Sequence, residues 1–143
     1  ILVTIAAALG VGETMRTTGL AQRIAETAIG ATSSDPWLIL VAIYATSMVL
    51  TEFLSNNATA AIIYPITMAT TASLGLDPKP FLIAVMIAAS CGFATPFGYQ
   101  TNLMVFGPGG YRFGDFLRLG VALDLVVMAV TVCVLPLVFD LRA

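Results

Sequence analysis

The sequence between two apolar runs reads Ser55-Asn56-Asn57, and a third apolar run is interrupted by Thr95-Pro96-Phe97-Gly98-Tyr99-Gln100-Thr101-Asn102. Each stretch places polar residues where a membrane helix is normally apolar throughout. An unsatisfied backbone N–H or C=O in hydrocarbon costs several kcal/mol, so a broken helix persists at membrane depth only where the freed groups face protein, water or a bound ion. The two breaks therefore indicate a binding site.

The composition predicts that the chain lies in a membrane. Hydrophobic residues make up 59% of the 143 residues and charged residues 10%, and the mean hydropathy is +0.98. Soluble domains carry about 25% charged residues. We therefore expect an all-α, polytopic membrane protein. The net charge of −2 comes from few charges and no basic patch occurs in the sequence, so nucleic acid is not an expected partner.

The sequence argues against catalysis. It contains no histidine, which removes the usual proton relay, imidazole metal ligand and base for a serine nucleophile. Cys91 and Cys133 each lie within an apolar run, and two isolated thiols match neither a disulfide framework nor a metal-binding spacing. We interpret both as buried packing residues and do not expect an enzyme.

The first 30 residues predict a helix end followed by an arm. Residues 1–11 are apolar but too short to span a bilayer on their own. From Glu13 to Gly30, Leu20, Ile24 and Ala28 recur at helical spacing, which predicts an amphipathic helix lying in the membrane interface. A solvated connecting helix is the alternative interpretation.

A hairpin is predicted over residues 36–74. Asp35 is the expected N-cap and Pro36 the first residue of a helix to about Leu54; a second helix runs from Ala58 to about Leu74, where Gly75-Leu76-Asp77-Pro78 ends it. Each arm has about 17 residues and a length of roughly 25 Å, which is marginal for a crossing. Periodicity alone allows two full spans or one re-entrant hairpin.

A broken transmembrane helix is predicted over residues 78–107 and a last span over 118–140. The broken helix consists of Phe81–Ala94 and a half-helix from Asn102 to Phe106, and the last span runs from Leu119 to Phe139. Asp124 falls within the first two turns of that span, where a helix N-terminus and interfacial water favour an anion. Intramembrane carboxylates are candidates for function, but we expect a structural role for this one.

The two breaks predict adjoining sites for an anion and a cation. The residues expected to cap new helices, exposing their N–H groups and a positive dipole of roughly +0.5 charge toward an anion, are Ser55, Asn56, Asn57, Thr101 and Asn102. The helix ends at Leu54 and Ala94 would present unpaired carbonyls. Together with side-chain oxygens of Thr51, Asn56 and Asn102, these are neutral hard ligands that sodium accepts.

The positions of the basic residues predict coupling between these two ions. None of the six lies in either break; they are Arg16, Arg23, Lys79, Arg112, Arg118 and Arg142. Desolvating a multivalent anion without a partner charge is very costly, and a co-bound cation is the cheapest remedy. We expect Glu52 to play a structural part, either by pairing with Arg16 or Arg23 or by capping a helix interaction in the interior.

At these residues the chain resembles the divalent anion–sodium symporter family. The stretch 51–61 (TEFLSNNATAA) with Tyr64-Pro65-Ile66 is similar to its second signature hairpin, and Asn102–Gly107 with Gly109-Gly110-Tyr111 is similar to its second broken helix. The resemblance implies the C-terminal inverted repeat of an elevator-type symporter, with 36–74 as a re-entrant hairpin. It also implies a homodimer in the inner membrane, surrounded by lipid, with an N-terminal half elsewhere in the polypeptide.

The resemblance also implies site residues. The sodium site would use side chains of Thr51 and Asn56 and the carbonyls of Leu54, Gly98 and Gln100, and the substrate site would use Ser55, Asn56, Asn57, Tyr99, Thr101 and Asn102. Dicarboxylate members carry Thr-Pro-Pro where this chain has Tyr99-Gln100-Thr101. This departure favours the sulfate-type branch. A dicarboxylate or arsenite-type transporter, a passive channel and a structural subunit are the alternatives.

Overall fold

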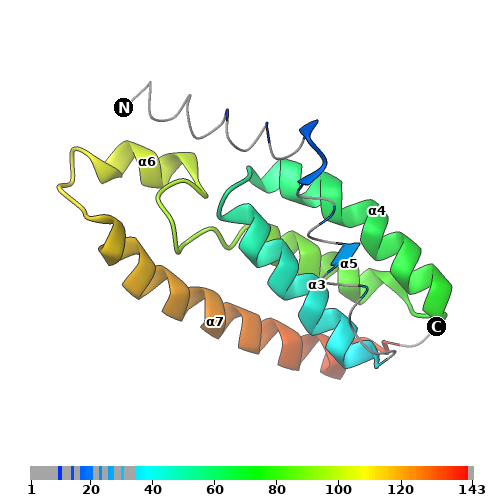
Figure 1. Cartoon of the computed structure of the whole chain (residues 1–143). Helices are drawn as coiled ribbons and strands as arrows, with labels where there is room; N and C mark the ends of the chain where they lie inside the picture. The colour runs from blue at the N-terminus through cyan, green and yellow to red at the C-terminus, as the bar shows by residue number, and fades with distance from the viewer. Residues whose placement is uncertain are drawn as a thin grey trace.

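The computed structural model describes residues 10, 14, 17–20, 23, 26–27, 30 and 35–141. Within 35–141 it contains the helices α3 (Pro36–Thr51), α4 (Asn56–Leu74), α5 (Pro78–Ala89), α6 (Gln100–Phe106) and α7 (Phe113–Val138), shown in Figure 1. The prediction of an all-α fold is confirmed for this part of the chain. The predicted interfacial arm falls largely outside the described residues.

Local sequence signals set several helix ends as predicted. The Asp35 side chain accepts a hydrogen bond from the Trp37 backbone N–H at 2.8 Å and caps α3, with Pro36 as its first residue. Gly75 ends α4 with a φ of 64°, a left-handed conformation that glycine adopts at little cost. Asp77 caps α5 in the same way as Asp35 caps α3, at 3.0 Å from the N–H of Lys79.

Several helix boundaries differ from the prediction: α4 begins at Asn56 rather than Ala58, and α6 at Gln100 rather than Asn102. Helix α3 ends at Thr51 rather than near Leu54, and α5 ends at Ala89 rather than Ala94. Helix α7 begins six residues before Leu119, at Phe113, because the Asp115 carboxylate accepts from the Arg112 N–H at 2.8 Å and fixes an earlier start. Hydropathy does not detect such a cap, since the residues that form it are charged.

Helix α3 is the central element of the bundle. It packs against α4, α5 and α7, and the core side chains that it contributes include Ile39, Leu40, Ile43 and Tyr44. The Tyr44 hydroxyl lies 3.6 Å from the Cys91 sulfur. Cys91 is buried as predicted, but Cys133 is exposed on α7, so the prediction that both thiols are packing residues is wrong for Cys133.

Helix α7 forms one side of the molecule and α6 lies near its beginning (Figure 1). The ring of Phe106 in α6 contacts that of Phe116 in α7, with centroids 5.9 Å apart. Tyr111, in the loop between the two helices, contacts the same Phe116 ring at 5.8 Å. Among the described helices α7 alone is long and apolar enough to cross a membrane, while α3 and α5 are shorter apolar helices. Much of α7 is exposed, which suits a lipid-facing or subunit-facing span.

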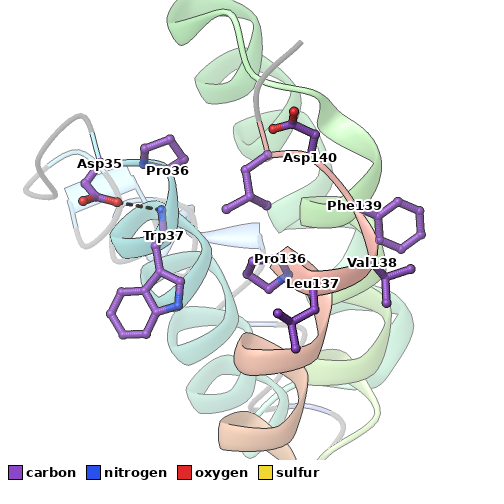
Figure 2. Close-up of a pocket in the computed structure, with 9 residues that line it drawn as sticks. Asp35, Pro36, Trp37, Pro136, Leu137, Val138, Phe139 and Asp140 are labelled. Carbon is purple, nitrogen blue, oxygen red and sulfur yellow. Dashed lines mark hydrogen bonds between the residues drawn. The ribbon is translucent and has the colours of Figure 1, made fainter.

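An open pocket of about 590 Å³ lies where α3 begins and α7 ends (Figure 2). Asp35, Pro36 and Trp37 line one side, and residues 136–141 line the other. The Asp35 carboxylate is already engaged as the cap of its own helix. This pocket lies at the opposite end of α3 from the first helix break, roughly 24 Å away along the helix axis.

Candidate functional site

The site combines two irregular segments from different parts of the chain. The tip comprises residues 52–55 between α3 and α4, and the unwound stretch comprises residues 90–99 between α5 and α6. Figure 1 shows the tip beside the unwound stretch. The unwound stretch is held in place by contacts from three other elements, which are Glu52 of the tip, Asn102 of α6 and Gly120 of α7.

Glu52 is the contact contributed by the tip. Its side chain is 7% exposed, and its Oε1 and Oε2 accept hydrogen bonds from the backbone N–H groups of Ala94 at 3.0 Å and Thr95 at 2.7 Å. The Thr95 hydroxyl donates to the Glu52 backbone carbonyl at 2.8 Å. The expected interior structural role of Glu52 is confirmed, and its partners among the described residues are backbone amides.

Gly98 brings the unwound stretch against α3. The Gly98 N–H donates to the Thr95 hydroxyl at 3.0 Å. A Cβ placed on Gly98 would lie 3.1 Å from the Thr51 carbonyl oxygen and 3.2 Å from Glu52 Oε2, so a glycine fits here more easily than any other residue. The backbone of Gly98 therefore lies close to the predicted sodium ligand Thr51.

Asn102 is the contact contributed by α6, and its role differs from the prediction. The cap position of α6 is Tyr99, without a side-chain hydrogen bond, so Thr101 and Asn102 lie inside the helix and do not cap it. The Asn102 amide instead donates to the carbonyls of Gly92 at 3.1 Å and Thr95 at 3.3 Å. This donation satisfies two backbone acceptors that the broken helix leaves open.

Gly120 is the contact contributed by α7. It is buried, and a Cβ there would overlap the carbonyl of Phe93 and approach the Ala94 Cα to 2.6 Å. Helix α7 can lie this close to the unwound stretch only because the residue has no side chain. Sequence reasoning did not select Gly120, since a single glycine in an apolar helix carries no local signal of a long-range contact.

Thr51 and Asn56 form the side-chain part of the predicted sodium site. The Thr51 hydroxyl donates to the Ala89 carbonyl at 2.6 Å and lies 3.3 Å from Asn56 Oδ1. The Thr51 hydroxyl also donates to Asn56 Oδ1 at this longer distance, and both side-chain oxygens keep lone pairs that can accept. Neighbouring neutral oxygens of this kind fit sodium. Leu54 is buried and Gln100 is exposed, and no described contact joins either residue to this pair.

The predicted substrate residues lie mostly at the surface. Ser55 caps α4, accepting from the Ala58 N–H at 3.3 Å, while Asn56 and Asn57 belong to the helix and do not cap it. The side chains of Asn57, Tyr99 and Thr101 are exposed. The structure therefore places these donors on the outside of the tip and at the start of α6, where another part of the protein or a ligand can contact them.

Asp124 belongs to the interior of this site, contrary to the prediction. Because α7 begins at Phe113, Asp124 lies about three turns into the helix rather than in its first two turns. Its side chain is 3% exposed and lies against the Glu52 carboxyl group and the backbone of Phe93 and Ala94. Water at the membrane interface therefore does not explain this carboxylate.

Lys79 is a described basic residue that is engaged away from the breaks. The Lys79 ammonium lies 5.4 Å from the centre of the Phe139 ring, and Arg112 precedes α7. A cavity of about 310 Å³ between the unwound stretch, α6 and α7 touches Asn102, but its other lining residues are mainly apolar. It does not suit a multivalent anion, which needs polar or charged partners when it is desolvated.

Comparison with known proteins assigns the chain to a family of transporters. The family described as "CitMHS: Citrate transporter" matches residues 1–142. The chain is 44% identical, over 99% of its length, to a candidate sulfur deprivation response regulator of Chlamydomonas reinhardtii. It is 43% identical, over 74% of its length, to "Uncharacterized transporter sll0640" of Synechocystis and 39% identical, over 91%, to "Sodium/sulfate cotransporter 1" of C. reinhardtii.

The chain corresponds to a part of these relatives. It spans 24% of the first relative, 17% of the second and 15% of the third. The residues at the two helix breaks resemble a family of sodium-coupled anion transporters. These matches confirm that resemblance.

Proposed function

Because the chain belongs to the citrate transporter family, we propose that it forms part of the C-terminal half of a secondary transporter that moves a small divalent anion, sulfate above all, together with sodium. Three relatives are named as sodium/sulfate cotransporters, at 38–39% identity over 91% of this chain. Their names support sodium as the coupling ion and sulfate as the substrate.

The observation that carries the proposal is the pairing of the two breaks around neutral oxygens. Thr51 and Asn56 place two acceptor oxygens 3.3 Å apart, and the Gly98 backbone approaches the Thr51 carbonyl. A cation bound at this group would supply the positive charge that a nearby anion requires, since no arginine or lysine occurs in either break. Coupling then follows from the chemistry of the site itself.

The exposed donors near the breaks support a compact oxyanion as the substrate. Asn57, Tyr99 and Thr101 offer amide and hydroxyl donors, and the α4 N-terminus offers free backbone N–H groups and a positive dipole end. Sulfate presents acceptor oxygens in all directions and suits donors that arrive from several segments. We place the substrate between these donors and the N-terminal half of the same polypeptide.

The family resemblance supports the remaining parts of the proposal. In an elevator-type transporter, residues 36–74 would be a re-entrant hairpin and 78–107 a broken transmembrane helix, which move together past a stationary part. We propose a homodimer in the inner membrane. The short lengths of α3 and α5 agree with segments that enter the bilayer without crossing it fully.

Uptake by the full-length protein in liposomes tests this function. We expect labelled sulfate to accumulate when an inward sodium gradient is applied and to equilibrate slowly when choline replaces sodium, and citrate and succinate are included as competitors. Sulfate flux of equal size in both buffers would indicate a channel, and a complete lack of uptake would favour a structural subunit. Preference for citrate over sulfate would overturn the substrate assignment.

Asn56→Ala is expected to weaken sodium activation of sulfate uptake at least tenfold while the protein remains folded. The variant removes one of the two adjacent oxygens but leaves Ser55 as the cap of α4, so little stability is lost. Uptake is measured against sodium concentration, with melting temperature as the folding check. Ser73→Ala, at the exposed far end of the same helix, is the matched control. Unchanged sodium activation in Asn56→Ala would exclude this residue as a ligand.

A further inference from the structure

Two buried carboxyl groups meet behind the unwound stretch. Glu52 comes from the tip and Asp124 from α7, and their side chains are 7% and 3% exposed. The Asp124 carboxyl group lies against that of Glu52 and against the backbone of Phe93 and Ala94. Residues separated by more than seventy positions in the sequence are thus brought together as one acidic pair in the interior.

No described basic side chain supplies the positive charge that such a pair requires. Glu52 receives two backbone N–H donors, whereas Asp124 Oδ1 is buried without any hydrogen-bond partner. The other titratable groups that face Asp124 are the Tyr44 hydroxyl and the Cys91 thiol, and no described lysine or arginine acts on it. Buried charges in proteins are normally paired or bind a metal ion.

We propose that a monovalent metal cation, sodium in the working transporter, binds between Glu52 and Asp124. This site is separate from the group formed by Thr51, Asn56 and Gly98, and the inference rests on the proposed function. Asp124 Oδ1 is free to serve as a ligand. The carbonyl of Phe93 lies against Gly120, one helical turn before Asp124, and adds a neutral oxygen in the same region.

The donor set favours a monovalent over a divalent cation. Calcium takes six to eight oxygen ligands at its sites, and magnesium keeps several waters in a near-ideal octahedron. The buried pair here has two carboxyl groups, one of which already receives two N–H donors, and no cluster of three acidic, histidine or cysteine side chains occurs among the described residues. A small singly charged ion needs fewer anionic ligands.

A cation at this position would offset one of the two negative charges and join three elements. It would bridge α7, the tip and the unwound stretch, which α7 also contacts through the packing of Gly120 and through the ring pair Phe97–Phe113, whose centroids are 6.2 Å apart. Its binding would therefore stabilise the arrangement in which the Gly98 backbone lies against Thr51. The sodium dependence of the full transporter would then have two components, one from each cation site.

The number of sodium ions moved per sulfate tests the inference. Fluxes of labelled sodium and labelled sulfate are measured in liposomes containing the full-length protein, for wild type, Asp124→Asn and the control Asp115→Asn. Asp115 is an exposed carboxylate of the same helix, and an asparagine there can still accept from the Arg112 N–H. We expect the number of sodium ions moved per sulfate to fall by one in Asp124→Asn and to stay unchanged in Asp115→Asn.

A second measurement does not depend on transport by the variant. The melting temperature of the purified full-length protein is followed against sodium concentration, and we expect two saturating components in wild type. Asp124→Asn should remove one component and Asn56→Ala the other. If Asp124→Asn does not fold, Asp124→Glu, which keeps the charge, takes its place. The wild-type titration still shows whether there are one or two components. A single component in wild type would overturn the inference.

These outcomes separate the inference from the proposed function. A wild-type protein whose sulfate uptake ignores sodium refutes the proposed function. If wild type is sodium-coupled and Asp124→Asn moves the same number of sodium ions per sulfate, the function stands and the second site is refuted. If Asp124→Asn moves one proton fewer per sulfate rather than one sodium fewer, as followed with a pH-sensitive dye inside the liposomes, the second sodium site is refuted as well.

Discussion

Gly120→Ala is expected to abolish sulfate uptake by the full-length transporter and to lower its melting temperature. The added Cβ would overlap the Phe93 carbonyl and approach the Ala94 Cα to 2.6 Å, and these are backbone atoms that cannot rotate away. Overpacking of a core typically costs about 1–3 kcal/mol. Here either α7 or the unwound stretch must move, so the site loses its geometry together with stability.

Gly114→Ala provides the matched control for this substitution. Gly114 lies on the same helix, and a Cβ there has no atom within 4 Å. Gly114 lies in the first turn of α7, where alanine is favoured over glycine by less than the roughly 1 kcal/mol of a helix interior, so Gly114→Ala should leave uptake intact and keep or slightly raise the melting temperature. Uptake and melting temperature are measured for both variants. Equal uptake and equal melting temperatures of the two variants would show that transport does not depend on the close approach of α7 to the unwound stretch.

Glu52→Ala is expected to cause the second large effect, a loss of both uptake and stability. Removal of the carboxylate leaves the buried N–H groups of Ala94 and Thr95 without acceptors, and each unsatisfied group costs about 1–3 kcal/mol. The unwound stretch is then no longer fixed to the tip. Sodium activation should weaken as well, because Gly98 is free to move away from Thr51.

A comparison of Glu52→Gln with Glu52→Ala separates the hydrogen bonds from the charge. The glutamine carbonyl can accept one of the two N–H groups, so its melting temperature should lie between those of wild type and Glu52→Ala. Both variants lack the charge and should bind sodium less well. Hydrogen exchange of the Ala94 and Thr95 amides follows the local structure. Wild-type protection of these amides in Glu52→Ala would contradict the assigned role.

The sequence predicts those parts of the fold that depend on short-range signals. Asp35 followed by Pro36 begins α3, and Gly75 ends α4, because an N-cap, a fixed proline φ and a left-handed glycine act over one turn of the chain. The neutral oxygens of Thr51 and Asn56 were also predictable, since they lie five residues apart at a break. The helix breaks themselves are visible as polar residues in apolar runs.

The parts that the sequence did not predict depend on contacts between distant residues. Asn102 was expected to cap a helix, yet its amide donates to Gly92 and Thr95, which a single-segment pattern cannot reveal. Asp124 was assigned to the start of its helix because hydropathy placed that start too late. Its contact with Glu52 follows from the packing of α7 against the unwound stretch. The re-entrant topology and the assignment of residues to the substrate stay predictions.

The hydrogen bonds from Ala94 and Thr95 to Glu52 have a thermodynamic consequence for the two ligands. These bonds connect the backbone near Gly98 to the segment that carries Thr51 and Asn56. An ion that orders one segment therefore orders the other in part, and a second ligand that binds there loses less conformational entropy. The free energy of this linkage is shared: sodium raises the affinity for the anion by the same factor by which the anion raises the affinity for sodium.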